Sequence, residues 1–227
     1  MWNESFFSAP QLKRDPLGGP ASTPTHSPIE AARLYATLME ELKLRASLVL
    51  DITHQRVTVP GPEAAPIELV CIQLRKILEL IAFGSLVANR TTYAVAHANF
   101  AEHWNAKRML QKLAKIHKEF YPRPLAIRAQ EQPGVHNFVD VDRPFLTQDD
   151  FVFLYDAASK ALHIRNPFQS TAPIDFRISI ADWIVRIQQL LGIHLVRFVD
   201  TPDLWVVNMS APGDGKVHVS LASPREG

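Results

Sequence analysis

The stretch Leu74-Arg75-Lys76-Ile77-Leu78-Glu79-Leu80-Ile81 decides the fold of this chain. Its apolar residues recur at the three- and four-residue spacing of one helix face, and the pattern continues on both sides. We therefore predict a long buried helix over residues 67–88. Arg75 and Glu79 are one helical turn apart and are expected to pair. The apolar stripe of this helix comprises Ile67, Val70, Cys71, Leu74, Ile77, Leu78 and Ile81.

A helix is also predicted before this central one, from residue 28 to an end within residues 51–55. Ser27 is suited to cap it, Pro28 to occupy its first position, and Glu30 to complete a capping box. Leucines then recur at helical spacing, and they are the expected core positions: Leu34, Leu38, Leu42 and Leu48. Residues 57–66 contain three prolines and a glycine, which predicts a loop between the two helices.

A third helix is predicted over residues 92–119. It is expected to end before Tyr121-Pro122-Arg123-Pro124, because proline lacks a backbone donor and restricts the residue before it. Together the three helices form a predicted N-terminal antiparallel bundle over residues 28–125. Residues 1–27 are predicted to be a disordered or extended arm, since prolines, glycines, serines and threonines dominate them.

The remaining residues, 126–227, are predicted to form an α+β region that begins with an irregular stretch to residue 145. Thr147 with Asp150, and Ser179 with Asp182, repeat the capping signature and predict two helices. The apolar period then changes to strict alternation, which predicts a small antiparallel meander of three strands. The expected elements are helices over 148–162 and 180–191 and strands over 193–199, 204–209 and 217–221. The predicted fold class is therefore α+β, mainly helical.

Composition excludes several classes of function. The chain has 227 residues, a net charge of +1 and one cysteine, so no global field draws it to nucleic acid or membrane and no internal disulfide forms. We expect a reducing, cytoplasmic compartment, since no secretory leader is apparent. The most apolar run, residues 77–88, is shorter than the roughly 20 residues of a membrane span. A membrane protein is therefore not expected.

The common catalytic signatures are absent from the sequence. It has no nucleophile elbow, phosphate loop, dinucleotide glycine fingerprint or zinc motif, so no metal or cofactor is expected. Cys71 stands among apolar residues and is expected to be an inert core residue. The isolated histidines His163, His194 and His218 are expected to be packing or surface residues rather than ligands.

One spacing favours RNA chemistry. Arg90 and His97 are seven residues apart, so on a continuous helix they share one face. A neutral histidine could accept the proton of a ribose 2′-hydroxyl, and a fixed guanidinium could stabilise the extra charge on the phosphorane. The alternative is that Arg90 caps a helix C-terminus and that His97 packs or faces water.

A family resemblance follows from these positions. Two adjacent helices, with Arg75 and Glu79 in the first and Arg90-x6-His97 at the entry to the next, resemble the HEPN superfamily over about residues 67–120. That superfamily consists of small, often dimeric helical bundles. Many members are metal-independent ribonucleases of bacterial toxin–antitoxin and phage-defence systems. The resemblance implies that Arg90 and His97 are the catalytic pair and that two such pairs meet across a homodimer interface.

A basic row on the third predicted helix is the second candidate for RNA contact. Its members recur at helical spacing and could follow a phosphate backbone: Arg108, Lys112, Lys115 and Lys118. The alternative is a solvated face whose cations lie near the negative end of the helix dipole.

Two main hypotheses of function follow. The first is a HEPN-like defence or toxin-type protein that cleaves RNA without a metal. The second is a non-catalytic interaction or dimerisation module in a bacterial complex, which the absence of a complete site beside ample apolar helix surface favours. A pocket for a small ligand between the two halves is a third option. RNA, a second copy of the chain or another protein are the corresponding partners.

Overall fold

The computed structural model describes residues 27–89, 106–128, 137–163, 173–199 and 201–223. Of the predicted arm over residues 1–27, only Ser27 falls within them. Within the described residues the helices are α1 (Pro28–Thr53), α2 (Ala65–Ala88), α4 (Ala106–Ile116), α5 (Gln148–Ala161) and α6 (Ile180–Leu191). The strands are β1 (Arg123–Arg128), β2 (Asn137–Asp140), β3 (Ile193–Arg197), β4 (Leu204–Asn208) and β5 (His218–Ala222). The chain is thus an α+β protein in which helices predominate, as predicted.

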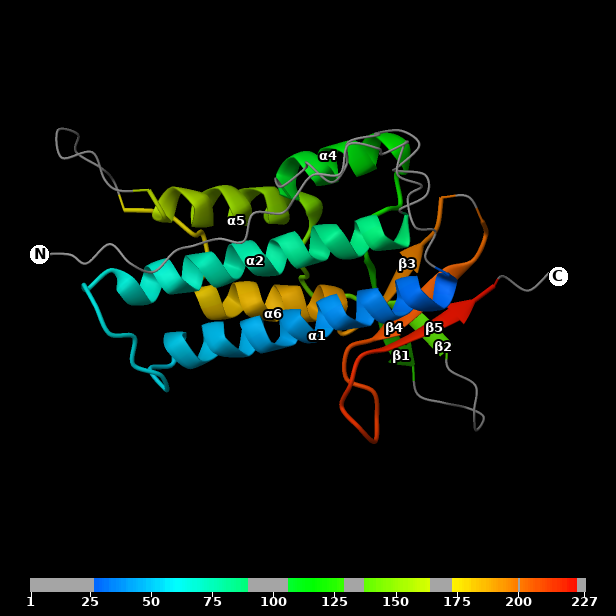
Figure 1. Ribbon diagram of the computed structural model, residues 1–227, viewed down its shortest axis with the longest axis horizontal. Helices are drawn as coiled ribbons and strands as arrows, with labels where there is room; N and C mark the ends of the chain where they lie inside the picture. Colours follow the sequence, from blue (N-terminus) through cyan, green and yellow to red (C-terminus); the bar gives the residue numbers. More distant parts are fainter. Residues whose placement is uncertain (1–26, 90–105, 129–136, 164–172, 200, 224–227) are drawn as a thin grey trace, which may run out of the picture.

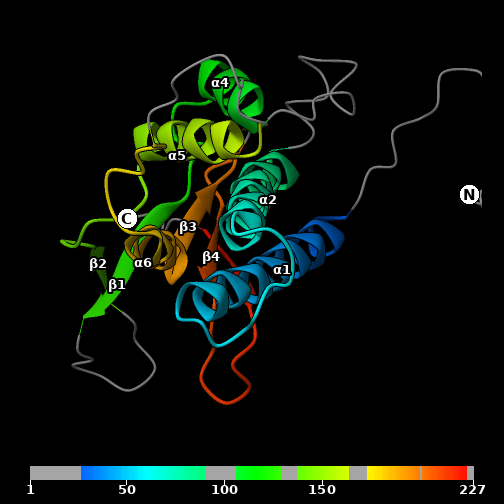
Figure 2. The ribbon, with the colours of Figure 1, turned by 90° about the vertical axis from the view of Figure 1, so that its left-hand side faces the viewer.

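Helix α2 lies at the centre of the helical layer. It runs antiparallel to α1, and α4 and α5 lie on its other side (Figure 1). Figure 2 shows the helices end-on, with α2 again between α1 and α5, and with α6 next to strand β3. Six of the seven predicted stripe residues of α2 are buried, and only Ile67, in its first turn, is exposed. The helix begins at Ala65, two residues before the predicted start, with Pro66 in its first turn.

The predicted start of α1 is confirmed in detail. The Ser27 hydroxyl accepts the backbone N–H of Glu30, whose carboxylate accepts the N–H of Ser27. The predicted core stripe of this helix is partly wrong, because Leu34 is 42% exposed whereas the neighbouring Tyr35 is buried. The leucine spacing alone misplaced the stripe, since tyrosine, methionine and alanine supply much of the buried face. The buried residues of α1 are Tyr35, Met39, Leu42, Ala46, Val49 and Ile52.

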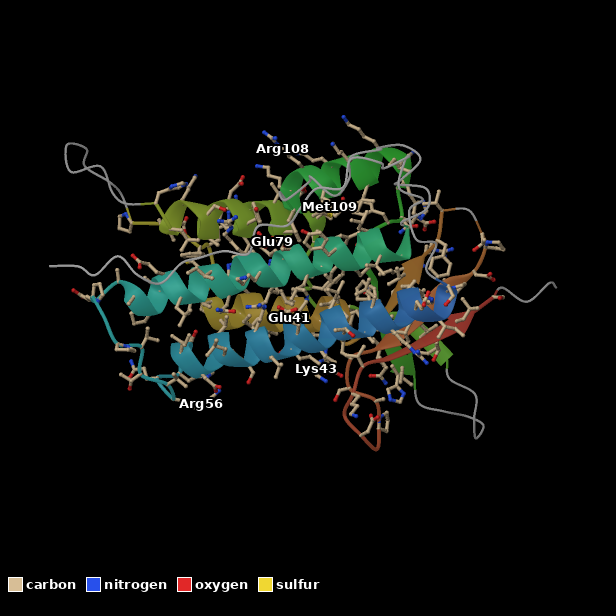
Figure 3. The ribbon with its side chains drawn as sticks, in the orientation of Figure 1. Glu41, Lys43, Arg56, Glu79, Arg108 and Met109 are labelled. Carbon is tan, nitrogen blue, oxygen red and sulfur yellow. The ribbon has the colours of Figure 1, made fainter. Side chains whose placement is uncertain are left out.

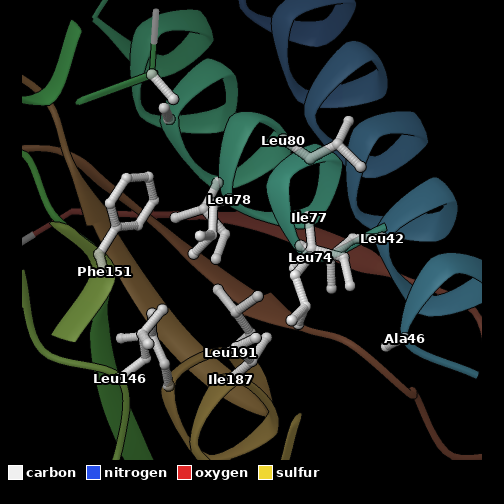
Figure 4. Packing of buried hydrophobic residues seen from close by; sticks show 14 of the residues in the cluster. Leu42, Ala46, Leu74, Ile77, Leu78, Leu80, Leu146, Phe151, Ile187 and Leu191 are labelled. Atoms are coloured by element: carbon white, nitrogen blue, oxygen red, sulfur yellow. The ribbon is translucent and has the colours of Figure 1, made fainter. Parts of the chain in front are cut away.

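The hydrophobic core joins the helices from both halves of the sequence. Side chains of α1, α2, α5 and α6 meet in one cluster, in which Leu74, Ile77 and Ile187 are fully buried (Figure 4). The predicted boundary between residues 125 and 126 falls inside β1. Burial of this cluster is the main source of stability, because apolar surface removed from water contributes roughly 25 cal/mol per Å².

The capping signatures of the later helices are also confirmed. Thr147 caps α5 with Asp150 in a capping box, and Ser179 caps α6 by accepting the N–H of Asp182. Asp150 additionally binds Arg186 of α6, with a distance of 3.1 Å between Oδ2 and Nη1. The start of α5 is thereby tied to the middle of α6, because the carboxylate that completes the cap of α5 also binds Arg186.

The sheet is larger than predicted. Its order is β2-β1-β3-β4-β5 and every neighbouring pair is antiparallel. Strands β3, β4 and β5 are the predicted meander, each within two residues of its predicted bounds. The expectation of an irregular stretch up to residue 145 is wrong, because β1 and β2 form a hairpin there. The prolines around these short strands argued against a strand prediction. Pro124 is nevertheless compatible with β1, because it lies near the start of the strand, where a missing backbone donor is tolerated.

The third predicted helix is described only in part. Helix α4 covers Ala106–Ile116, and the chain turns after it rather than continuing to residue 119. Residues 92–105 of the prediction lie outside the described residues. Among the described helices, none has the length and apolarity needed to cross a membrane.

Candidate nucleic-acid interface

Helix α4 has two contrasting faces. Met109, Leu110 and Leu113 are buried on the face toward the core, whereas Arg108 and Lys115 are exposed on the other. Figure 3 shows Met109 between α4 and α2, and Arg108 extending from the outer side of α4. The amphipathic sequence pattern therefore orients this helix, since its apolar stripe is buried on the side that faces α2.

The outer face of α4 is basic over its whole length. Lys112 is half-buried, and Lys118 is exposed just after the helix ends. No carboxylate occurs among residues 106–118, which contain Lys107 and the four predicted RNA-binding residues. The predicted basic row thus lies on or directly after one helix, on the side away from the core.

An ion pair fixes α4 against α5. Nζ of Lys107 is 2.5 Å from a carboxylate oxygen of Asp156, and both side chains are partly exposed. Because it is solvent-accessible, this pair contributes little to stability, typically below about 1 kcal/mol. It joins α4 to α5 beside the row that begins at Arg108.

The predicted catalytic pair, Arg90 and His97, lies outside the described residues. Asn89, the last described residue before this pair, caps the end of α2 and is buried. The Asn89 side chain donates to the carbonyl of Ser85 and accepts the backbone N–H of Val199, both at 3.1 Å. The C-terminal end of α2 is therefore tied to the residues that directly follow β3.

The predicted pair of Arg75 and Glu79 is confirmed, with 3.6 Å between Nη2 and Oε1. Arg75 also donates to the Tyr155 hydroxyl at 3.2 Å and lies over the Tyr155 ring, 5.2 Å from its centroid. Its Nε atom is buried and has no hydrogen-bond partner among the described residues. These contacts join α2 to α5 through a partly exposed arginine.

His194 is a buried polar residue that the sequence did not distinguish from the other histidines. Its Nδ1 lies 2.7 Å from the carbonyl oxygen of Leu191, and its Nε2 lies 2.7 Å from the Tyr35 hydroxyl. A carbonyl only accepts, so Nδ1 carries the proton and Tyr35 donates to Nε2. Burial lowers the pKa of His194 to about 4. This neutral, fully bonded histidine links α1 to β3 and has no free nitrogen for catalysis.

Cys71 is a buried core residue, as predicted. Its side chain is buried in α2, and burial, with a smaller effect of Glu68, raises the pKa of the thiol to about 11. The thiolate form needed for nucleophilic attack is therefore scarce at neutral pH. Among the described residues, no three histidine, cysteine or acidic side chains are grouped so that they could hold a metal ion.

No family model, curated protein or solved structure matches this chain.

Proposed function

We propose that this chain binds RNA along the outer face of α4 and cleaves it without a metal, using Arg90 and His97. The supporting observation is the basic row itself, which lies on the outer side of a helix whose other side is buried. A phosphate backbone is the partner that this charge favours, because neutralising phosphates releases bound counterions.

The length of the row fits a short run of nucleotides. Arg108 and Lys115 are separated by seven residues, or about 10 Å along the helix axis at 1.5 Å per residue. Stacked nucleotides rise by about 3.4 Å each along one strand, so the row spans roughly three of them. Lys118 extends the basic surface beyond the end of α4.

The cleavage step assigns one role to each residue of the pair. His97 accepts the proton of a ribose 2′-hydroxyl, whose oxygen attacks the adjacent phosphorus. Arg90 stabilises the charge on the phosphorane. The bond to the 5′-oxygen then breaks, and that oxygen takes up a proton, which leaves a 2′,3′-cyclic phosphate and a 5′-hydroxyl. A toxin-type or defence role would follow from this activity.

Binding is tested separately from cleavage, with a fluorescent single-stranded RNA whose 2′-hydroxyls are methylated. The triple variant Arg108→Gln/Lys112→Gln/Lys115→Gln should bind at least about tenfold more weakly, and its salt slope should fall by about 2. Equal binding by this variant and wild type would overturn the assignment of α4.

The matched control removes three exposed cations elsewhere, at the two ends of α1 and in the loop between β4 and β5. It is Arg33→Gln/Arg56→Gln/Lys216→Gln, which changes the net charge by the same amount. This control should bind as wild type does, because a local row and not total charge is proposed to hold the RNA.

Cleavage is tested with unmodified RNA in the presence of EDTA. Wild type should release fragments with cyclic phosphate ends, whereas His97→Ala and Arg90→Ala should bind RNA without cutting it. Absence of cleavage by wild type, or equal cleavage by His97→Ala, would refute the proposed cleavage step. RNA binding would then be the function that remains.

A further inference from the structure

Lys107 lies where the basic face of α4 meets its buried face. On a regular helix, the four cations of α4 point within an arc of about 140°, with Lys107 at one margin and Lys112 at the other. Leu110, less than one turn after Lys107, is buried. Lys107 is therefore a member of the basic face by direction, but it is placed beside the packed side of the helix.

A carboxylate of the neighbouring helix binds this lysine. Nζ of Lys107 is 2.5 Å from Oδ2 of Asp156, which belongs to α5 and lies 49 residues further along the chain. The two side chains are 32% and 45% exposed, so water reaches both. Because an exposed pair adds little to folding stability, its larger consequence is for the charge of the surface on which it lies.

Asp156 changes what this surface offers to a phosphate backbone. Residues 106–118 contain no carboxylate of their own, so the negative charge beside Lys107 comes from α5. It cancels the charge of Lys107, and it repels a phosphate that approaches this lysine. Lys107 therefore adds no net charge to the start of the row.

We propose that Asp156 limits RNA binding by holding Lys107 away from phosphate, so that the binding row begins at Arg108 and not one residue earlier. This inference rests on the proposed function, since it concerns the regulation of the same row. The carboxylate keeps the affinity below the value that the cations of α4 would give without it. A weaker complex in turn releases its RNA faster.

Asp156→Asn removes the negative charge with almost no change of size. Lys107 keeps its place on the helix, and its charge becomes available to a phosphate. RNA should then bind about fivefold more tightly at about 0.1 M salt, and the salt slope should rise by about 1, because one more phosphate is neutralised. An Asp156→Asn variant with the affinity and slope of wild type would overturn the proposal.

Lys107→Gln separates the holding of this lysine from a simple effect of charge. If Lys107 contacts no phosphate in wild type, this variant keeps the wild-type slope and binds only slightly more weakly, through the carboxylate that it uncovers. The double variant Asp156→Asn/Lys107→Gln should return to the affinity and slope of wild type. A slope that falls by about 1 in Lys107→Gln alone would mean that Lys107 already contacts RNA, which contradicts the proposal.

A second exposed pair supplies the matched control. Asp51 and Arg56 lie at the end of α1, with 2.8 Å between Oδ1 and Nε. Figure 3 shows Arg56 on the opposite side of the molecule from Arg108. Asp51→Asn changes the net charge by the same amount as Asp156→Asn and also releases a cation, yet it should bind as wild type does. An equal gain in this control would show that net charge alone sets the affinity, and the proposal would be wrong.

The measurement is fluorescence anisotropy of the methylated single-stranded RNA with the full chain, between about 50 and 200 mM salt. Circular dichroism confirms that each variant is folded. The triple variant of the row separates this inference from the proposed function. If the triple variant binds as wild type does, the row and this inference fail together. If it binds more weakly and Asp156→Asn changes nothing, only this inference fails.

Discussion

Helix α2 and the β1–β2 hairpin are opposites within one fold. The helix is surrounded by α1, α4 and α5 and buries half of its residues. Within the described residues, the hairpin pairs with the rest of the sheet only at Arg123 and Pro124. The spacing of its apolar residues predicts the helix, whereas no pattern in the sequence predicts the hairpin. The contrast shows that sequence patterns report burial, so an element that buries little leaves little trace in them.

The largest expected effect comes from the buried side of this comparison. Leu74 of α2 is fully buried among side chains of α1 and α6. Leu74→Ala should lower the free energy of unfolding by about 3 kcal/mol, because it removes buried methyl groups and leaves a cavity. Urea denaturation followed by circular dichroism measures this. A loss below about 1 kcal/mol would mean that α2 is not the centre of the core.

His194, which joins β3 to α1, should make the free energy of unfolding depend on pH. Burial lowers the pKa of His194 to about 4 in the folded chain, against 6.5 for an ordinary histidine. Protonation therefore favours the unfolded state. The contribution of this residue is complete above about pH 6.5 and is lost as the pH falls toward 4, by about 3 kcal/mol.

Urea midpoints between pH 4 and 7.5 measure that slope. His194→Gln should be less stable at neutral pH and should lose much of the slope, whereas the exposed His54→Gln should keep it. An unchanged slope in His194→Gln would show that another group carries the acid sensitivity.

A smaller effect is expected where α2 approaches α1 most closely. A β-carbon at Gly84 would lie 2.9 Å from Cε2 of Tyr35, and this ring is held by its bond to His194 and by an edge contact with Trp205. Gly84→Ala should therefore cost about 1–2 kcal/mol, despite the gain of about 1 kcal/mol that alanine brings to a helix. Thermal unfolding tests this, and adding Tyr35→Leu should remove the penalty if the ring is its cause.

Local signals explain what the sequence predicted correctly. The capping boxes at Ser27 and Thr147 need only residues three positions apart, and the stripe of α2 needs only its own spacing. The basic row on α4 was visible for the same reason, because a helix with one apolar face must turn its other face outward. Each of these predictions depends on contacts that are close in sequence.

Distant contacts explain what was missed. No local motif separates His194 from His163 or His218, since its partner Tyr35 is 159 residues away. Its inward position in the alternating pattern of β3 was the one available hint. The hairpin gave no comparable signal, because Ile127 and Phe138 are exposed although they are apolar.

The smallest effect is expected in that hairpin. Ile127 is about half exposed, so Ile127→Ala should change the free energy of unfolding by less than about 0.5 kcal/mol. Amide hydrogens of β2 should also exchange faster than those of α2, because few buried contacts oppose local opening of an edge hairpin. A loss above about 2 kcal/mol, or exchange as slow as in α2, would show that the hairpin belongs to the cooperative core. Low burial would then not be the reason why the sequence pattern failed to predict it.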